Sequence, residues 1–401
     1  WHVNFSRIGF RAIMVPFFIT FGLYYLLKGF ESSKYRDLII SGVFFGLGFY
    51  TYISYRFVVL LLAVILFLYW QESKKKNAVA MFTNRIKYLL ISTFVVALPI
   101  GLYFLFRIGD FFGRASGVSV LQQNNPLLAL LKSIAVHLGM FNFYGDANWR
   151  HNYSGSPELF WPVGIIFLIG LIISIISLIK SHKNRNFPLF VSHSLLLSWI
   201  VILLIPGFLS GEGIPHALRV IGVIPPVYIL AGIGGIWFYE RLKKFYATKN
   251  QKIMFFSIIS FIVLLLTYYE FNRYFYDWGM RKEVQAEFNQ NYVNMANYLN
   301  SLPDNVNKYV MADVDGVLVN NIPMPAQTII FLERAKYGNT RAIYLKSDEL
   351  DKIKPDKGTV ILIMKEDSDL FMKLLTTFQK DLFYQSNGYW IMTLANDYTI
   401  K

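Results

Sequence analysis

The sequence predicts a polytopic α-helical membrane protein that carries a small C-terminal α/β domain, and two observations predict this fold class. Of the 401 residues, 55% are hydrophobic and only 16% are charged, which is too apolar for an ordinary water-soluble domain. Long apolar runs alternate with short basic loops up to about residue 279, where the composition changes. We therefore expect a multi-pass transmembrane domain over residues 1–279 and an extracytoplasmic α/β domain over residues 280–401.

The net charge of +14 would suggest nucleic-acid binding in a soluble protein. Here the basic side chains lie in short loops between apolar runs, where the positive-inside rule and anionic lipid headgroups account for them. We therefore expect membrane lipids as partners and no nucleic acid. The sequence contains no cysteine, which excludes disulfide bonds and thiolate metal sites.

The first two apolar runs predict one span and one helical hairpin. Ala12 to Leu27 is free of charge, and with its flanking residues it can cross a bilayer core that needs about 20 residues. Leu38 to Gln71 is too long for one span and slightly short for two. Its glycines permit close helix packing, and its TYISYR segment is typical of a turn. We expect two short helices here, with Arg56 near the tip of the hairpin.

Three loops rich in lysine and arginine mark the expected cytoplasmic side: QESKKKNAVAMFTNRIK, KSHKNRN and ERLKKFYATKNQK. The further expected spans are Tyr88 to Phe106, Trp161 to Ile179, Leu189 to Ile205, Val220 to Tyr239 and Met254 to Tyr269. Because the basic loops alternate with the others, the positive-inside rule places residues 1–11, the loop 107–160, the turn at 211–216 and the C-terminal domain on the outer side.

Prolines mark two further features of the expected helices. Pro225 and Pro226 should break or kink the outer part of the Val220 to Tyr239 span. Within the long outer loop, Pro126 to Met140 has helical spacing of its apolar residues and predicts an amphipathic helix along the membrane interface.

The composition after Met280 predicts a small α/β domain. Gln285 to Leu302 is expected to form one amphipathic helix. Four segments predict strands (KYVMAD, AIYL, GTVILIM and GYWIMTL), and SDELDKI and DSDLFMKLLTTF predict helices between them. The domain has no glycine-rich phosphate loop and no metal-ligand cluster, so we expect a structural or substrate-shaping role.

Several basic residues lie at outer helix ends, where the positive-inside rule predicts few of them. They are Arg7, Arg56, Arg150, His151, His216 and Arg219. Basic groups that converge from different helix ends suit an anionic headgroup such as a phosphate, because arginine donates in a bidentate fork. The alternative is that each side chain only snorkels toward lipid phosphates.

The segment MFNFYGDANWRHNYSGSP, residues 140–157, concentrates polar and aromatic side chains between two apolar runs. We expect it to form a lid or wall of an outer cavity, with Trp149, Arg150 and His151 as substrate contacts. Its acid, Asp146, and Glu212 of the later turn are candidates for a catalytic base or a cation ligand.

Both acids also have a purely structural interpretation. Asp146 would cap the turn after Gly145 and pair with Arg150, and Glu212 would pair with His216 or Arg219. We assign no residue as a metal ligand, because Asp146 and His151 alone are weak support for a metal site. A divalent cation is the one cofactor that the sequence leaves open.

Four segments resemble, in the same order, parts of a known enzyme family. They are HVNFSRIGFRAIMVPFF, GVFFGLGFYTYISYR, MFNFYGDANWRHNYSGSP and PHALRVIGVIPPVYILAGIG. Together they resemble the multi-pass GT-C glycosyltransferases of family 39, which include protein mannosyltransferases and aminoarabinose transferases. The resemblance covers about residues 1–270.

This resemblance implies transfer of a sugar from a polyprenyl-phosphate carrier to a protein, lipid or glycan acceptor at the outer face of the cell membrane. It assigns carrier-phosphate binding to Arg7, Arg56 and Arg219. The family places its catalytic aspartate in the first outer loop, which is expected upstream of Trp1, so no residue of this chain takes that role.

Two other functions remain open. One is a non-enzymatic transporter or flippase of an anionic lipid, which would need polar groups deep in the helices and often an inverted repeat. The other is a membrane-anchored binding protein whose working part is the α/β domain.

Overall fold

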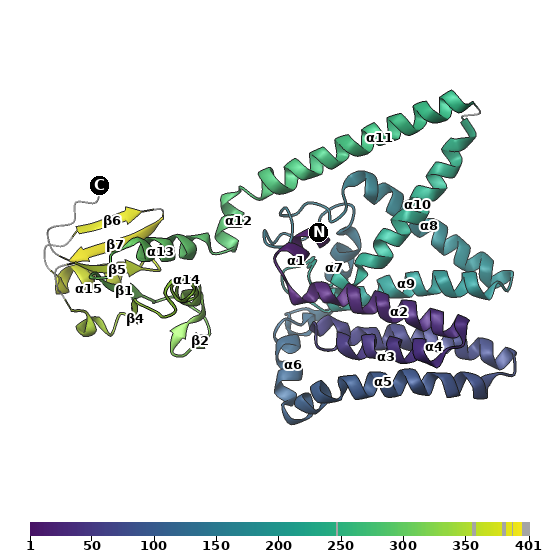
Figure 1. The fold of residues 1–401 in the computed structure, drawn as a ribbon, viewed down its shortest axis with the longest axis horizontal. Helices are drawn as coiled ribbons and strands as arrows, with labels where there is room; N and C mark the ends of the chain where they lie inside the picture. Colours follow the sequence, from purple (N-terminus) through teal and green to yellow (C-terminus); the bar gives the residue numbers. More distant parts are fainter. Residues whose placement is uncertain (246–247, 355–357, 379–381, 387, 395–401) are drawn as a thin grey trace. The chain divides into compact units, whose positions relative to one another are not determined.

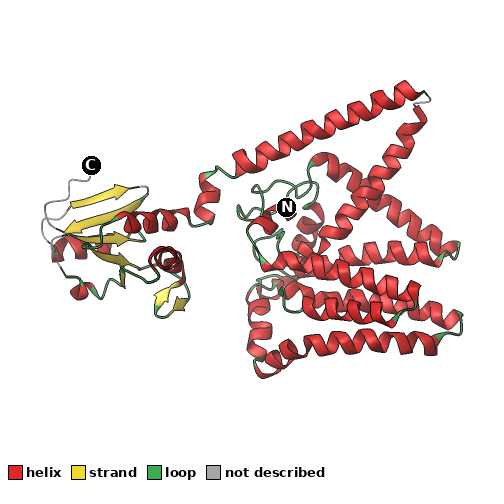
Figure 2. Ribbon diagram, viewed as in Figure 1, coloured by secondary structure: helices red, strands yellow, loops and turns green. Residues whose placement is uncertain are grey.

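The computed structural model describes residues 1–245, 248–354, 358–378, 382–386 and 388–394. The chain divides into two units, Trp1–Glu270 and Phe271–Lys401. The first unit is built from helices, and the second contains the strands (Figures 1 and 2).

Seven helical stretches in the described part of the chain are long and apolar enough to cross a membrane. Their main helices are α2 (Met14–Ser32), α4 (Val58–Lys75), α5 (Val79–Phe106), α8 (Trp161–Lys183), α9 (Phe187–Phe208), α10 (Ile224–Leu242) and α11 (Lys249–Asn272). The chain is thus a multi-pass membrane protein by helix length and composition.

The predicted turn that contains Arg56, between two helices, is confirmed. Helix α3 (Tyr35–Gly48) and α4 flank a turn that contains the 3₁₀ helix η2 (Ile53–Phe57). The 14 residues of α3 cover only about 21 Å, so this arm is shorter than a bilayer core of about 30 Å.

Two predicted spans differ in their boundaries. Helix α5 begins at Val79 rather than Tyr88, so it takes in part of the basic loop. Pro225 and Pro226 lie in the first turn of α10, after the separate 3₁₀ helix η4 (Ile221–Val223). Proline is tolerated in a first turn because no intrahelical N–H is needed there. The two prolines therefore lie at the start of α10. The predicted interruption of the span lies just before them, where η4 gives way to α10.

Short helices and loops gather at one end of the spanning helices in Figure 1, whereas the lysine-rich loops after α4, α8 and α10 lie at the other ends. The short helices are α1 (His2–Arg7), η1 (Arg11–Ile13), α6 (Ile108–Gly117), η3 (Val120–Gln122) and α7 (Pro126–Gly139). The predicted helix from Pro126 is confirmed as α7, and the side chain of Asn125 caps it by accepting from the Leu128 N–H at 3.2 Å. Helix α6 was not predicted.

Glycines allow the spanning helices to pack at backbone contact. A Cβ added at Gly234 of α10 would lie 1.9 Å from the carbonyl oxygen of Ile166 on α8, and one at Gly170 would lie 1.8 Å from the oxygen of Leu230. The predicted close packing at Gly42 is confirmed, since a Cβ there would lie 2.5 Å from the Leu89 oxygen on α5. Small residues of this kind replace the hydrophobic driving force between helices in a bilayer.

The second unit begins at the end of α11, includes the π-helical turn η6 (Arg273–Trp278) and contains a five-stranded sheet of order β4-β1-β5-β7-β6. The strands are β1 (Asn307–Met311), β4 (Ile343–Leu345), β5 (Thr359–Ile363), β6 (Leu382–Ser386) and β7 (Tyr389–Leu394). Strand β1 pairs in parallel with β4 and β5, while β7 is antiparallel to β5 and β6. A separate two-stranded sheet joins β2 (Leu318–Val319) and β3 (Ile322–Pro323).

Helices cover both faces of the five-stranded sheet. Along β1, Val310 faces a core shared with α13 (Gln290–Ser301) and α14 (Gln327–Tyr337), and Tyr309 and Met311 face a core shared with α15 (Ser368–Thr377). The four predicted strands are therefore confirmed as β1, β4, β5 and β7.

Other predictions for this unit were wrong or incomplete. The single helix over Gln285 to Leu302 is two helices, α12 (Lys282–Glu287) and α13, because Asn289 between them has a positive φ of 57°. SDELDKI forms only the 3₁₀ turn η8 (Leu350–Lys352). Strand β6, the turn η7 (Met324–Ala326) and helix α14 were missed. Strand β6 pairs with β7 alone, so its sequence lacks the apolar run of a central strand.

The helix contact at Gly234 generates a matched pair of variants. We expect Gly234→Ala to lower stability by about 1–3 kcal/mol, since the new methyl group forces α8 and α10 apart. Gly232→Ala on the same helix should be neutral or slightly stabilising, because nothing lies within 4 Å of its added Cβ and alanine favours helix. Apparent melting temperatures in detergent test both, and equal effects would contradict the backbone contact.

Candidate functional site

The loop between α7 and α8 folds by local hydrogen bonds. The N–H of Gly145 donates to the Gly155 oxygen at 3.2 Å, and the N–H of Gly155 donates to the Asp146 oxygen at 3.0 Å. Gly155 has a positive φ of 72°, which glycine adopts without steric cost. Oδ1 of Asp146 accepts from the Asn148 N–H at 2.8 Å, so the predicted turn after Gly145 is confirmed.

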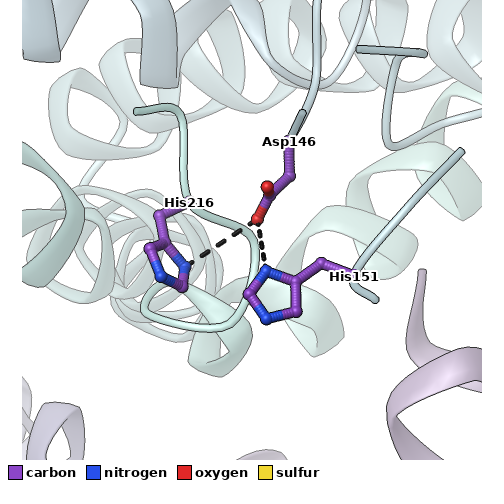
Figure 3. Close-up of side chains that lie close together, drawn as sticks. All are labelled: Asp146, His151 and His216. Atoms are coloured by element: carbon purple, nitrogen blue, oxygen red, sulfur yellow. Dashed lines mark hydrogen bonds and ion pairs between the residues drawn. The ribbon is translucent and has the colours of Figure 1, made fainter. Parts of the chain in front are cut away.

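The other oxygen of Asp146 connects this loop to the turn before α10. Oδ2 accepts from Nδ1 of His151 at 2.8 Å and from the backbone N–H of Ala217 at 2.8 Å. Nδ1 of His216 lies 3.8 Å from the same oxygen, and Figure 3 shows both imidazole rings beside the carboxylate. Asp146 and His151 are buried, with 2% and 4% of their surface exposed.

The surroundings of Asp146 and His216 shift the pKa values of both side chains. Burial by itself raises the pKa of Asp146, but the hydrogen bond and charge of His151 and the Asn148 N–H outweigh it and hold the pKa below its ordinary value. Burial, and next the charge of Arg219, lower the pKa of His216 to about 3. At neutral pH, Asp146 is therefore an anion and His216 is uncharged.

A second buried acid, Glu158, supports the loop and was missed in the sequence. Its Oε1 accepts from the Asp146 N–H at 3.0 Å and from Nδ2 of Asn152 at 3.3 Å. Burial raises the pKa of Glu158 to about 8, so the folded protein holds it protonated at neutral pH. A lone acid directly before an apolar span was the available signal, since such charges are costly.

Two further supports were also missed. Nδ1 of His137 donates to the Ser133 oxygen at 2.8 Å, which leaves Nε2 to accept from the His216 N–H at 3.1 Å. Nδ2 of Asn4 donates to the carbonyl oxygens of Arg150 at 2.6 Å and His151 at 3.1 Å. A single histidine in the apolar segment of α7 was the sequence signal for His137, and nothing in the sequence pointed to Asn4.

The structure therefore brings together three of the predicted site residues: Asp146, His151 and His216. Arg219 lies on the same turn, half-buried, and its Nη1 is 3.4 Å from the backbone oxygen of Glu212. The Glu212 side chain is exposed. Trp149 packs against Tyr153 with ring centroids 5.3 Å apart.

The remaining predicted phosphate ligands lie outside this cluster. Nη1 of Arg56 donates to the Phe111 oxygen of α6 at 2.7 Å, and its guanidinium is 3.7 Å from the centre of the Phe111 ring. Arg7 is exposed in the last turn of α1. The structure thus holds Arg56 against α6, whereas the sequence predicted it at a hairpin tip as a phosphate ligand.

No family model, curated protein or solved structure matches this chain. Fold and site together define a multi-pass helical membrane protein with a buried Asp–His–His cluster in the loops at one end of its helices.

The bonds of Asp146 can be tested with an isosteric variant. Asp146→Asn should lower stability by about 3 kcal/mol, because a neutral amide presents its own N–H₂ to donor groups and leaves buried groups unpaired. Asp110→Asn is the control, since Asp110 is exposed and its side chain accepts from the Tyr103 hydroxyl at 2.7 Å. Apparent melting temperature and proteolysis of the 140–160 loop measure the effect. Equal stability of the two variants would contradict the role of Asp146.

Glu158 predicts a pH dependence of stability with a definite sign. Its pKa is about 8 when folded and 4.5 for the free side chain, so its contribution is complete below pH 4.5 and is lost as pH rises toward 8. The loss is at most about 1.4 kcal/mol per pH unit. Glu158→Gln mimics the protonated acid, so we expect stability near that of the wild type at about pH 5 and higher stability at about pH 8.

Melting temperatures across this pH range check the expectation, with Glu212→Gln as the exposed control. A Glu158→Gln variant that is less stable than the wild type near pH 8 would show that the folded protein favours the ionised acid, which contradicts a raised pKa.

Proposed function

We propose that this protein is a glycosyltransferase that moves a sugar from a polyprenyl-phosphate carrier to a protein, lipid or glycan acceptor at the outer membrane face. The observation that carries the proposal is the cluster of Asp146, His151 and His216 beside Arg219, built into loops at one end of membrane-length helices. A carrier lipid in the bilayer would present its phosphate at such an end. The ordered resemblance of four segments to family 39 enzymes supports the same class.

The two ends of the helices differ in charge, which supports an outer location for the site. Lysine and arginine concentrate in the loops that begin near Lys74, Lys180 and Arg241, and these loops lie at the opposite helix ends from the cluster. Basic loops remain in the cytoplasm. We therefore propose that the cluster and the loop 107–160 face the extracytoplasmic side.

The proposed reaction needs a cation at the leaving group. The acceptor hydroxyl oxygen bonds to C1 of the sugar, the bond from C1 to the carrier phosphate breaks, and the hydroxyl proton passes to a base. The carrier phosphate leaves with the bonding electrons. Arg219 is suited to stabilise this charge, because guanidinium and phosphate form bidentate bonds. Arg7 and Arg56 remain proposed phosphate contacts.

Asp146 is better suited to positioning than to proton transfer. Both of its oxygens accept hydrogen bonds and the residue is buried, so an acceptor hydroxyl does not reach it in this arrangement. The base is therefore another group, and Glu212 is the exposed acid on the adjacent turn.

The spanning helices offer little support for a transporter. Among their described residues, no carboxylate, lysine or arginine is buried, and the one buried histidine, His193, is hydrogen-bonded to Ser174 at 2.8 Å. Ion and substrate pathways through a bilayer usually contain buried ionisable groups.

Arg219 provides the direct test. In proteoliposomes that contain the full-length protein and a panel of labelled polyprenyl-phosphate sugars, Arg219→Gln should reduce sugar transfer about 100-fold or more. Lys132→Gln, at an exposed position of α7, should keep wild-type activity. Normal transfer by Arg219→Gln would reject the phosphate assignment, and lipid movement without any sugar transfer would identify a transporter.

A further inference from the structure

Three potential metal ligands converge from two loops that are far apart in the chain. The ligand atoms of Asp146, His151 and His216 lie within 4.8 Å of one another, the one such group of residues in the described part of the chain. In Figure 3 the Nδ1 atoms of both rings are directed at Oδ2 of Asp146. Only 16% of the His216 side chain is exposed, and the other two side chains are more deeply buried.

The nitrogen of His216 that faces the carboxylate has no hydrogen-bond partner among the described residues. Its Nδ1 is buried and makes no hydrogen bond to any described residue. The distance of 3.8 Å to Oδ2 of Asp146 exceeds the roughly 3.2 Å limit of an N–H···O hydrogen bond. A buried polar atom without a partner costs free energy. A cation between this nitrogen and the carboxylate would remove that cost.

Neighbouring residues hold the backbone of both histidines and the carboxylate of Asp146 in place. The His216 N–H donates to Nε2 of His137 at 3.1 Å, and Nδ2 of Asn4 donates to the His151 oxygen at 3.1 Å. The Ala217 N–H holds the carboxylate at 2.8 Å. Hydrogen bonds behind the ligands are what orients the side chains of metal sites.

We propose that Asp146, His151 and His216 bind a divalent transition-metal ion of the zinc class. Two imidazoles and one carboxylate are zinc ligands, whereas calcium and magnesium select oxygen ligands. Three protein ligands leave one coordination position for water, as in catalytic zinc sites. The proposal rests on the geometry of the cluster and does not depend on glycosyl transfer.

Binding requires a change of tautomer at one ligand. Nδ1 of His151 donates its hydrogen to Oδ2 of Asp146 at 2.8 Å, and the ion takes the place of this hydrogen when the ring proton moves to Nε2. Both atoms then offer lone pairs to the ion, and the Ala217 N–H still bonds the carboxylate.

The test measures zinc binding to the full-length protein in detergent, purified with a tag that contains no histidine. After EDTA treatment and dialysis, titration with Zn²⁺ and elemental analysis should give about one ion per chain. Co²⁺ should give the visible absorption of a four-coordinate site. His216→Gln should weaken binding about 100-fold or more. His193→Gln is the matched control, since it removes a buried histidine outside the cluster.

Substoichiometric zinc in the wild-type protein, or equal zinc affinity of His216→Gln and His193→Gln, would overturn the proposal. The wild-type protein also provides a test that needs no variant. Zn²⁺ added after EDTA treatment should raise the apparent melting temperature, whereas Mg²⁺ should not. An unchanged melting temperature in saturating zinc would overturn the proposal even if every cluster variant failed to fold. Because no sugar donor is present, the result is independent of transferase activity.

Discussion

The carboxylate of Asp146 joins two loops whose bonded residues are 71 positions apart in the chain. One oxygen shapes the turn at Asn148, and the other binds His151 and the amide of Ala217. These hydrogen bonds hold the loop before α8 against the turn before α10. A buried anion is costly unless every lone pair is used, so Asp146 is stable only in the folded arrangement that supplies all three donors. The positions of both histidines beside it, and of Arg219 on the same turn, depend on this one group.

The bilayer explains why the polar chemistry lies at the helix ends. Backbone groups inside a membrane must be bonded within the protein, which restricts that part of the chain to helices. Close packing then depends on small residues, as at Gly170 and Gly234, where two backbones touch. Ionisable side chains are expelled from such a bundle unless they are paired. The loops at the helix ends escape this restriction, and they can form tight turns around buried groups such as Glu158 and His137.

The sequence predicted the candidate site in part. A polar aromatic loop between apolar runs pointed to Asp146 and His151, and basic residues at helix ends pointed to His216 and Arg219. The contact between the histidines was not predictable, because it depends on where α7 and α8 place one loop against the start of α10. Arg56 shows the limit of the same reasoning. Its type and its place at a hairpin tip suggested a phosphate ligand, but its surroundings include the Phe111 ring and carbonyl of α6.

Hydrophobic periodicity and charge determined which segments form apolar helices, the order of the basic loops and the four main strands of the second unit, since burial and solvation act on each segment locally. Tertiary structure alone decided the protonation of Glu158, the neutral state of His216 and the ligand-like arrangement of Asp146, His151 and His216. These properties depend on desolvation and on distances of a few ångströms between residues far apart in the chain. A local sequence pattern cannot predict these distances, because they are set by how the helices pack against one another.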